Sequence, residues 1–416
     1  MRIKQFAKAG LPAALLAATL AAPFSPARAA QPRAGSTLTV WTYVGAPATK
    51  AVQQLANQWA AGKGVTVKVI TNPATSNPFQ GFSTVAHTGK GPDIGFAIPS
   101  DNLGTFQLAG LIAQAPSDAF NASLYIPQTV QAVTFNGKYY AAPLNIGTYQ
   151  LVYNKSLVPN PPKTWDQLFA LAKRFPNTKG KTYGFFEDWT IPYFAYSIIR
   201  GFGGYYLKET PTGVNPNDIG VDTPGAIKGL QFIQSMYTSG IIPADVNSNI
   251  AGSLFQKGQL AMWIDGTWDI GVNTQALGSK FGAEPLPTLP GGLQPHPFSS
   301  DYSAFVNAFS KNQPMAWSLI EYLATRYPQL DVKIDGSLPA QKSLLDSPVV
   351  QKDPILSGYA RTALAAEPIP NAPQMQAVWT PVQNQITLLS HGKVTPAQAG
   401  ANMLQQIKQG EAQFTQ

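Results

Sequence analysis

The sequence predicts an α/β protein of two or more lobes, and two observations carry that prediction. Segments with strand periodicity alternate with segments of helical periodicity, and 416 residues exceed what one hydrophobic core usually serves. The first unit is complete, with a strand at 36–43, a helix at 48–60 and a strand at 65–70. A strand–helix–strand unit of this spacing gives parallel strands joined by a right-handed crossover.

Two later strands end next to side chains of chemical interest. The apolar segment 94–98 is followed by Asp101 and Asn102, and the strand predicted at 260–265 is followed by Trp268. Open α/β sheets bind their ligands at the carboxyl ends of strands. We therefore expect these side chains to lie near a ligand site.

Three predicted helices begin with recognisable capping residues. Thr164 with Gln167 forms the pattern of a capping box, while Thr223 and Thr395 each precede a proline at the first helical position. The last of these helices is predicted to end at Gly410, because glycine commonly terminates helices. The chain has no long low-complexity linker and no internal repeat of 20–50 residues.

Residues 1–29 have the pattern of a secretory signal peptide. Basic residues precede the short apolar run 10–22, and the small-residue cleavage pattern ends at Ala29. An N-terminal amphipathic helix is the alternative reading. The chain has no Cys, which excludes disulfides, thiolate chemistry and a lipid anchor on an N-terminal Cys. We expect a mature protein free in the periplasm or outside the cell.

The charges are sparse and scattered. Only 12% of residues are charged, and after removal of four basic residues with the signal the balance is 25 − 21 = +4. No basic cluster resembles a nucleic-acid footprint, so we expect no nucleic-acid partner. A chain with few carboxylates changes its charge little in acid, which favours the hypothesis of an acidic habitat.

The stretch 183–206 contains ten aromatic residues in 24 positions, against 45 in the 416 of the whole chain. Such a stretch is either the buried face of a helix or the lining of a cleft. Tyr and Trp combine a flat apolar face with a polar group, which suits a sugar. Composition alone leaves both readings open.

The sequence offers no pattern for catalysis, metal binding or a cofactor. The histidines stand far apart, at His87, His296 and His391, and no phosphate-binding glycine loop is present. A glycosidase needs two paired carboxylates. The carboxylates available for such a pair are Asp101, Glu187, Asp188 and Asp265. Nothing in the sequence pairs them, and we expect a binding protein rather than an enzyme.

Six segments together resemble the periplasmic maltose/maltodextrin-binding proteins, the solute receptors of ATP-driven sugar importers. The segments are 89–94 (GKGPDI), 153–168 (YNKSLVPNPPKTWDQL), 191–194 (IPYF), 201–205 (GFGGY), 255–268 (FQKGQLAMWIDGTW) and 367–379 (EPIPNAPQMQAVW). They occur in the family's order and span nearly the whole mature chain. PNPPKTW followed by PNAPQMQAVW is the most specific part of the match.

The resemblance implies a two-lobed periplasmic-binding-protein fold, in which each lobe is a mixed sheet flanked by helices and three segments form the hinge. The crossings are expected near 144–149, 286–290 and 336–341. The N-terminal lobe would comprise 30–144 and 290–338, and the C-terminal lobe 145–289 and 339–416. A ligand would bind in the interlobe cleft, and the form closed around it would be recognised by a membrane permease.

The resemblance also implies a set of ligand-binding residues, which are Tyr43, Asp101, Asn102, Tyr193, Phe194, Trp268, Trp379 and Gln383. Tyr193 and Phe194 correspond to the family's ring pair, and Trp268 and Trp379 to its stacking tryptophans. Two alternatives remain: Phe194 supports Tyr193 without touching the ligand, and Asp101 caps a helix.

Most of the family's charged contacts are absent from this sequence. Residues 44–47 replace an acid and a lysine, Gly147 and Ile191 replace glutamates, and Asn102 and Gln383 replace arginines. Each lost charged hydrogen bond is worth about 1.5–3 kcal/mol in a buried site. The side chains available to compensate for these contacts are Asn145, Glu187, Asp188 and Asp265.

We therefore expect a monomeric receptor for maltodextrin-type α-glucans. The expected ligands are maltose and maltotriose, with cyclodextrin as a further candidate. The absent charges favour the longer or cyclic ligands, which depend more on stacking. The expected partners are the ligand and the permease subunits of an ABC transporter. The alternatives are another oligosaccharide and, as a more distant one, a secreted glycosidase.

Overall fold

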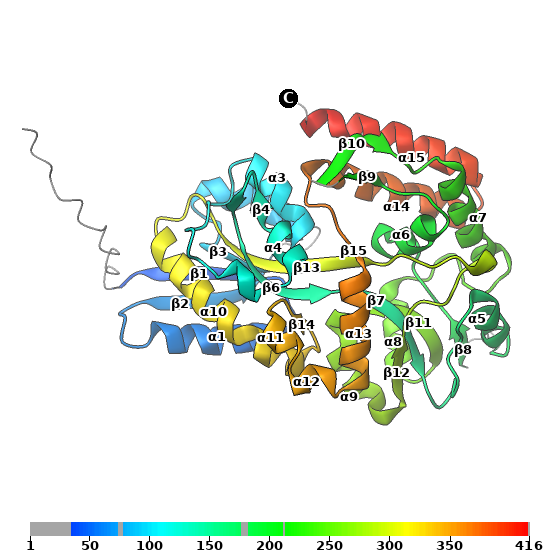
Figure 1. Ribbon diagram of the computed structural model, residues 1–416, viewed down its shortest axis with the longest axis horizontal. Coiled ribbons are helices and arrows are strands. Elements are labelled where there is room, and N and C mark those ends of the chain that lie inside the picture. The colour runs from blue at the N-terminus through cyan, green and yellow to red at the C-terminus, as the bar shows by residue number, and fades with distance from the viewer. Residues whose placement is uncertain (1–34, 74–77, 176–181, 211–212, 415–416) are drawn as a thin grey trace, which may run out of the picture. The chain divides into compact units, whose positions relative to one another are not determined.

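The computed structural model describes residues 35–73, 78–175, 182–210 and 213–414. The secretory signal predicted at 1–29 lies outside the described residues. Strands and helices alternate along the described chain, which confirms the prediction of an α/β protein (Figure 1).

The larger sheet has seven strands in the order β14–β6–β13–β3–β1–β2, and β15 pairs with β13. Its strands are β1 (Thr37–Thr42), β2 (Thr66–Thr71), β3 (Ile94–Pro99), β6 (Ala142–Gly147), β13 (Phe298–Val306), β14 (Leu338–Pro339) and β15 (Glu367–Pro368). As predicted, β1 and β2 are parallel, and β1 is also parallel to β3. Because β2 and β3 flank β1 on opposite sides, the carboxyl ends of β1 and β3 border a crevice.

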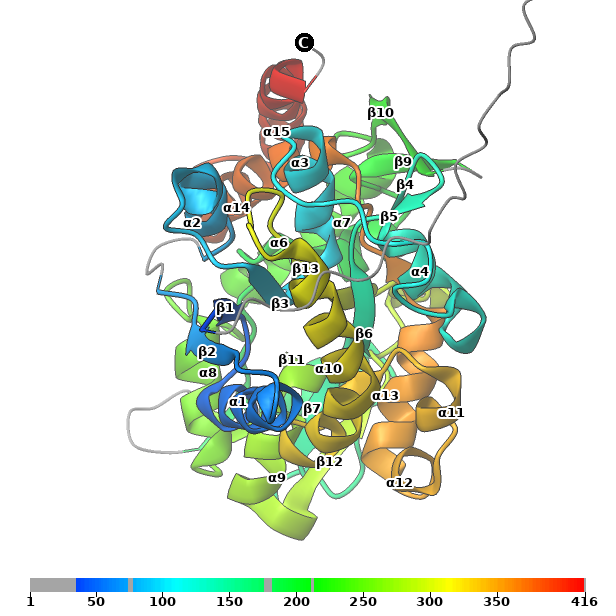
Figure 2. The same ribbon diagram turned by 90° about the vertical axis from the view of Figure 1, so that its left-hand side faces the viewer.

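Four helices accompany the first part of this sheet and one long helix follows β13. They are α1 (Ala46–Ala60), α2 (Pro78–Val85), α3 (Leu103–Leu108), α4 (Pro127–Ala132) and α10 (Gln313–Ile334), with the small β4 (Thr134–Phe135) and β5 (Lys138–Tyr139) after α4. The helix α1 packs against β2 and α10, and α10 packs against β6 and β13 (Figure 2). Leu55, Trp59 and Trp317 are among the buried side chains of this core.

The second sheet has four strands in the order β12–β7–β11–β8, which are β7 (Tyr149–Asn154), β8 (Tyr183–Phe185), β11 (Leu260–Gly266) and β12 (Phe281–Glu284). The helices that share its core include α5 (Trp165–Ala172), α6 (Pro192–Gly201), α7 (Pro224–Thr238), α8 (Ser248–Gln256), α9 (Ile270–Leu277), α13 (Pro354–Ala365), α14 (Gln376–Ser390) and α15 (Pro396–Glu411). Smaller elements are β9 (Leu207–Thr210), β10 (Gly213–Ile219), α11 (Lys342–Leu345) and α12 (Pro348–Gln351).

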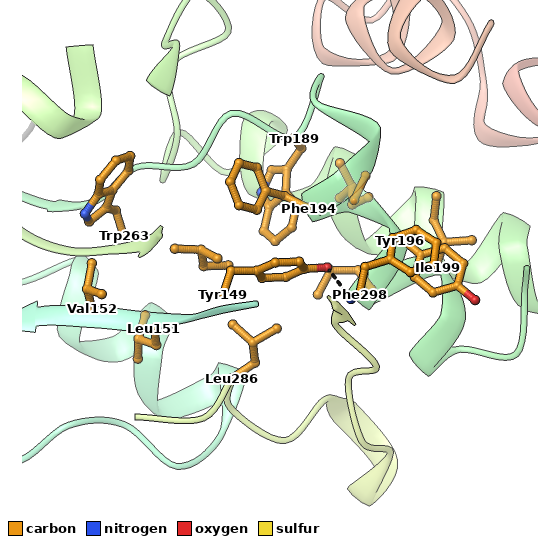
Figure 3. Packing of buried hydrophobic residues seen from close by; sticks show 14 of the residues in the cluster. Tyr149, Leu151, Val152, Trp189, Phe194, Tyr196, Ile199, Trp263, Leu286 and Phe298 are labelled. Atoms are coloured by element: carbon orange, nitrogen blue, oxygen red, sulfur yellow. Dashed lines mark hydrogen bonds between the residues drawn. The ribbon is translucent and has the colours of Figure 1, made fainter. Parts of the chain in front are cut away.

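The aromatic stretch 183–206 supplies the core of this second half. Its buried rings are Phe185, Phe186, Trp189, Phe194, Tyr196 and Tyr206. Tyr196 stacks on Phe298 with ring centroids 3.6 Å apart (Figure 3). Most of the stretch is therefore packing, and Tyr193 is the ring of the stretch that also lines the main cavity described below.

The helix beginnings follow the sequence closely, with one partial exception. Thr223 accepts a hydrogen bond from the backbone N–H of Ala226, and Thr395 with Gln398 forms a complete capping box. Thr164 caps its helix as predicted. The Gln167 side chain, however, accepts from the backbone N–H of Lys163 rather than from that of Thr164.

The prediction that Gly410 ends the last helix is wrong, because α15 continues to Glu411. A Cβ on Gly410 would lie 3.0 Å from the Cβ of Ala377 in α14. The glycine therefore permits a close approach of two helices, which the end-of-helix pattern in the sequence does not distinguish from a cap.

The chain passes between the two sheets at places close to those expected. β6 belongs to the larger sheet and β7 to the smaller one, with Thr148 alone between them. The return lies between β12 and β13, in the proline-rich segment 285–297. After α10 and β14, the chain continues through α11 and α12 to α13, which packs against β7 and β12.

Within the described residues, no helix combines the length and apolar character needed to cross a membrane. The same residues contain no group of three or more His, Asp or Glu side chains suited to a metal ion.

Candidate functional site

A cavity of about 870 Å³ brings together five of the eight predicted ligand residues. Asp101 and Asn102 come from the turn η2 (Ser100–Asn102), Tyr193 from α6, Trp268 from the turn η4 (Thr267–Asp269) and Trp379 from α14. The turn η2 follows β3 of the larger sheet, and η4 follows β11 of the smaller sheet. The cavity thus lies where strands of both sheets end, as the strand ends in the sequence predict.

Three of the predicted aromatic residues, Tyr193, Trp268 and Trp379, border the cavity. The Tyr193 and Trp268 ring centroids lie 6.0 Å apart, with an angle of 52° between the planes. Trp268 and Trp379 are both half-buried, so each retains exposed surface. Flat rings at the edge of a cavity provide the surface on which the C–H face of a sugar stacks.

Tyr193 is fixed by hydrogen bonds to two strands. Its hydroxyl donates to the backbone oxygen of Phe298 (3.3 Å) and accepts from the Ser300 hydroxyl (3.0 Å). The Tyr149 hydroxyl donates to the backbone oxygen of Tyr193 (2.8 Å) and accepts from the N–H of Phe298 (3.3 Å), the bond drawn in Figure 3. Because the hydroxyl of Tyr193 is engaged by the protein, its ring face is the group left to contact a ligand.

Two further cavities meet the first at Trp268. One of about 580 Å³ is lined by Phe194, Trp263 and side chains of α8, and one of about 470 Å³ is lined by Tyr43 and Asn145. Trp268 lines all three. This ring therefore occupies the junction of the whole candidate site.

Phe194 and Tyr43 lie in these two side cavities rather than in the main one. Phe194 is 6% exposed and its ring centroid lies 5.1 Å from that of Tyr149 and 5.6 Å from that of Tyr193. This packing agrees with a role in supporting Tyr193. Burial raises the pKa of the Tyr43 hydroxyl, and a hydrogen bond from Asn72 opposes that shift.

Asp101 contacts α14 and caps no helix. Its Oδ2 accepts from the Trp379 indole N–H and from the Gln376 amide, both at 3.2 Å. Neither η2 nor α3 has a side-chain cap, so the helix-cap alternative for Asp101 is wrong. Burial raises the pKa of Asp101 to about 6, although hydrogen bonds from Gln376, Trp379 and Asn102 oppose the shift.

Asn102 and Gln383 occupy very different positions. Asn102 is buried, and its amide donates to the carboxylate of Asp101 (3.1 Å) and to the backbone oxygen of Pro99 (3.2 Å). It orients the acid beside it. Gln383 is exposed on α14 and lines none of the three cavities. Its predicted contact with ligand stays a prediction.

The chain is similar in sequence to known bacterial proteins over most of its length. Residues 51–358 match the family model described as bacterial extracellular solute-binding protein. This chain belongs to the bacterial extracellular solute-binding protein family. A galactooligosaccharide-binding protein of Bacillus subtilis (strain 168) is 32% identical over 348 residues, which cover 80% of each chain.

Solved structures of this class share the fold of this solute-binding protein. The maltose-maltodextrin binding protein of the thermoacidophilic bacterium Alicyclobacillus acidocaldarius is 36% identical with a TM-score of 0.84, over 90% of this chain and 100% of that one. A cyclo/maltodextrin-binding protein complexed with maltotetraose is 27% identical with a TM-score of 0.76, over 91% and 98% of the two chains. The predicted two-lobed fold is confirmed.

Several cavity residues of this solute-binding protein were not predicted. Ser300, Tyr302 and Gln376 line the main cavity. Gln376 stands three positions before Trp379 in a segment already singled out, so a signal for it was available. Ser300 and Tyr302 reach the site only because β13 pairs antiparallel with β3 and β6, and such distant pairing leaves no local pattern.

Two of the four candidates for replacing the absent charges line the site. Asn145 lines the 470 Å³ cavity and Asp265 the 580 Å³ cavity, whereas Glu187 and Asp188 line none of the three. The amide of Asn145 donates to Asp331. Asp265 accepts from the Gly266 N–H (2.8 Å) and the Asn273 amide (2.7 Å).

Carboxyl groups gather around Trp268 without basic partners. Asp269, Asp331 and Asp335 line the 470 Å³ cavity, and none of the described residues lining the three cavities is Lys, Arg or His. Burial raises the pKa of Asp265, and the charge of Asp269 raises it further. Carboxyl groups whose pKa is raised retain protons that can be donated to hydroxyl oxygens.

Proposed function

We propose that the protein is the receptor of an ABC importer for maltodextrin-type α-glucan oligosaccharides. The ligands are maltose, maltotriose and cyclodextrin, bound between the two lobes and delivered after hinge closure. Loss of most of the family's charged contacts leaves stacking as the main source of affinity. Maltotriose and larger ligands are therefore expected to bind more tightly than maltose.

The observation that carries this proposal is the ring-bordered cavity of about 870 Å³ with Asp101 and amide groups beside the rings. This volume is within the range of about 300–1,000 Å³ common for ligand sites. The lining offers apolar faces and neutral or acidic hydrogen-bonding groups, which suit an uncharged sugar. A sugar phosphate is disfavoured, because phosphate groups prefer Arg or a helix N-terminus.

The test is a tryptophan-fluorescence titration of the mature protein with maltose, maltotriose and β-cyclodextrin in parallel. We expect a saturable response to at least one of them, with maltotriose tighter than maltose. The ring contacts at Trp268 and Trp379 should produce the signal. No response to all three sugars would overturn the assignment to α-glucans.

A galactooligosaccharide is the second candidate, because the Bacillus subtilis relative named for that ligand is 32% identical over most of the chain. The same titration with a galactooligosaccharide separates the two. Tighter binding of that sugar than of maltotriose would favour the second candidate. An aromatic-lined cavity alone does not distinguish the two sugars.

We further propose that the protein catalyses no reaction on its ligand. Within the described residues lining the main cavity, Asp101 is the single carboxylate, whereas glycoside hydrolysis needs two. Incubation with maltotriose and analysis of the sugars by chromatography should return maltotriose unchanged. Release of glucose or maltose would instead establish the glycosidase alternative.

The proposed location is the periplasm, after removal of residues 1–29 and without a lipid anchor. Mass spectrometry of the secreted protein should give a chain that begins at Ala30. A strain lacking the protein should lose uptake of labelled maltotriose, since the permease would receive no loaded receptor. The proposed lobes are 30–144 with 290–338, and 145–289 with 339–416; the changes of sheet between β6 and β7 and between β12 and β13 support boundaries near these positions.

A further inference from the structure

We propose that Asn371, packed on Gly104, forms a closure seam that sets ligand affinity without contacting the ligand. The closure seam consists of Gly104 with Asp101 on one side and Asn371 with Gln376 on the other. It is formed in this structure and would separate when the lobes open. The proposal rests on the proposed function, because it concerns closure around the same cavity.

The two sides of the seam belong to different hydrophobic cores. Leu103 and Phe106, which flank Gly104, pack with Phe305 of the larger sheet. Ile369 and Met375, on either side of Asn371, pack in the core of the smaller sheet. A contact between Gly104 and Asn371 therefore depends on how closely these two cores approach.

Gly104 is the position at which the approach is tightest. A Cβ built there would lie 1.9 Å from the backbone oxygen of Asn371, far closer than two non-bonded heavy atoms can approach. Gly104 lies inside α3 and does not have a positive φ. Glycine is therefore needed at this position because it lacks a side chain, not because of its backbone conformation. Any side chain at this position would hold the two sides apart.

Hydrogen bonds to backbone oxygens complete the seam. The Asn371 amide donates to the backbone oxygens of Gln131 (3.3 Å) and Ala132 (3.0 Å), at the end of α4. The last oxygens of a helix have no partner within it, so they are available to a docking side chain. The Gln376 amide likewise donates to the backbone oxygen of Asp101 (3.0 Å).

Gly104 and Asn371 are not among the residues lining the 870 Å³ cavity. An effect of these residues on binding must therefore act through the equilibrium between open and closed forms. When only the closed form binds tightly, the apparent Kd rises in proportion as the closed fraction falls. A substitution that props the seam open should weaken every ligand of the cavity alike.

The experiment compares Gly104→Ala and Asn371→Ala with the wild-type protein. Maltotriose affinity is measured by fluorescence, the radius of gyration by small-angle scattering, and the Tm without ligand. Gly104→Ala should raise Kd about tenfold and require correspondingly more ligand to reach the compact form, while Asn371→Ala should raise Kd about threefold. The Tm without ligand should stay near that of the wild type.

The matched control is Gly358→Ala in α13, where the nearest atoms to an added Cβ lie 3.9 Å away. Its Kd should equal that of the wild type. The proposal is overturned if both seam variants bind within twofold of the wild type. It is equally overturned if Gly104→Ala lowers the Tm while the ligand-induced compaction is unchanged, because that result identifies ordinary packing.

A second measurement needs no ligand and separates the seam from the proposed function. The chain has no native Cys, so Gln131→Cys combined with Asn371→Cys introduces the only two thiols. A short bismaleimide reagent should link them within one molecule, as a gel-mobility shift detects, even if no α-glucan binds. Failure to link them even after prolonged incubation, during which the reagent should trap molecules that close transiently, would overturn the seam, whereas linking without sugar binding would contradict only the ligand assignment.

Discussion

Trp268 follows a buried strand directly, and that position makes it the residue shared by the three cavities. A Cβ on Gly266 would lie 2.2 Å from the Trp268 ring, so the glycine allows the ring to fold back over its own strand. The centroid of the ring lies 6.0 Å from that of Tyr193 and 6.3 Å from that of Phe194, both in α6. This arrangement explains how one side chain can serve all parts of the site.

The substitution Trp268→Ala should weaken maltotriose binding by about 30-fold or more, because a central aromatic contact in a binding site is typically worth about 2 kcal/mol or more. Isothermal titration measures the change. The control is Trp165→Phe, which alters a fully buried ring outside the three cavities and should leave Kd unchanged. Equal affinities of Trp268→Ala and wild type would exclude Trp268 from the ligand contacts.

At the scale of single elements, the first residues of helices are the features that the local sequence determines most directly. α15 begins with Thr395, whose hydroxyl accepts from the Gln398 N–H (3.2 Å), while the Gln398 side chain accepts from the Thr395 N–H (2.9 Å). α15 also contributes Gln406 and Gly410 to the main cavity. The stability of this helix therefore bears on the shape of the site.

We expect Thr395→Ala to lower the free energy of unfolding by about 1 kcal/mol, since it removes the acceptor for an otherwise unpaired N–H. Urea unfolding followed by circular dichroism gives the value. Thr395→Ser keeps the hydroxyl and should remain close to the wild type. A loss as large for Thr395→Ser as for Thr395→Ala would show that the cap is not responsible.

The strand β3 shows an element-scale feature that periodicity does not reveal. The segment 94–98 was predicted as a regular strand, and β3 does form there. Its pairing with β13 shifts by one residue at Ala97, whose φ of 62° is rare for a residue with a side chain. Ala97 lines the 470 Å³ cavity, so the bulge shapes part of the site.

For the whole molecule, buried carboxyl groups determine how stability varies with pH. Burial raises the pKa of Asp101 to about 6, of Asp331 to about 6 and of Asp301 to about 7, all from 3.8. A raised pKa in the folded state means that folding favours the protonated form. Stability from these groups is therefore complete below about pH 4 and is lost as the pH rises from about 4 to 7.

One carboxyl group acts in the opposite direction. Burial tends to raise the pKa of Glu367, but hydrogen bonds from His296, Tyr196 and Arg200 bring it below its ordinary value. Its contribution is lost in acid as the pH falls through that lowered pKa. Because more buried carboxyls have a raised pKa than a lowered one, the balance favours stability at mildly acidic pH, in agreement with the hypothesis of an acidic habitat.

The free energy of unfolding should accordingly be larger at pH 5 than at pH 8 in urea titrations. Asp301→Asn should raise it at pH 8 by about 2–4 kcal/mol and leave it nearly unchanged at pH 4, because both carboxylate oxygens of Asp301 are buried without a hydrogen-bond partner among the described residues. Asp118→Asn, at an exposed position, serves as the control. A maximum of stability at pH 8 that Asp301→Asn does not alter would contradict this prediction.

Prediction from the sequence succeeded where the cause is local. The unit from β1 to β2, the caps at Thr223 and Thr395, and the strand before Trp268 all depend on residues within a few positions of one another. The resemblance supplied the two-lobed fold and the ring residues that border the cavity. The error at Gly410 arose because a helix-ending glycine and a helix-contact glycine look alike in sequence.

By itself the sequence determined the alternation of strands and helices, the helix caps and the aromatic residues available for a ligand, because periodicity and capping act over a few residues. Only the tertiary structure decided which of these rings line a cavity, that Asp101 bonds to α14, and that Gly104 meets Asn371. These contacts join residues more than 200 positions apart, and their geometry depends on the packing of whole sheets and helices. A pattern within a few neighbouring residues therefore cannot predict such long-range contacts.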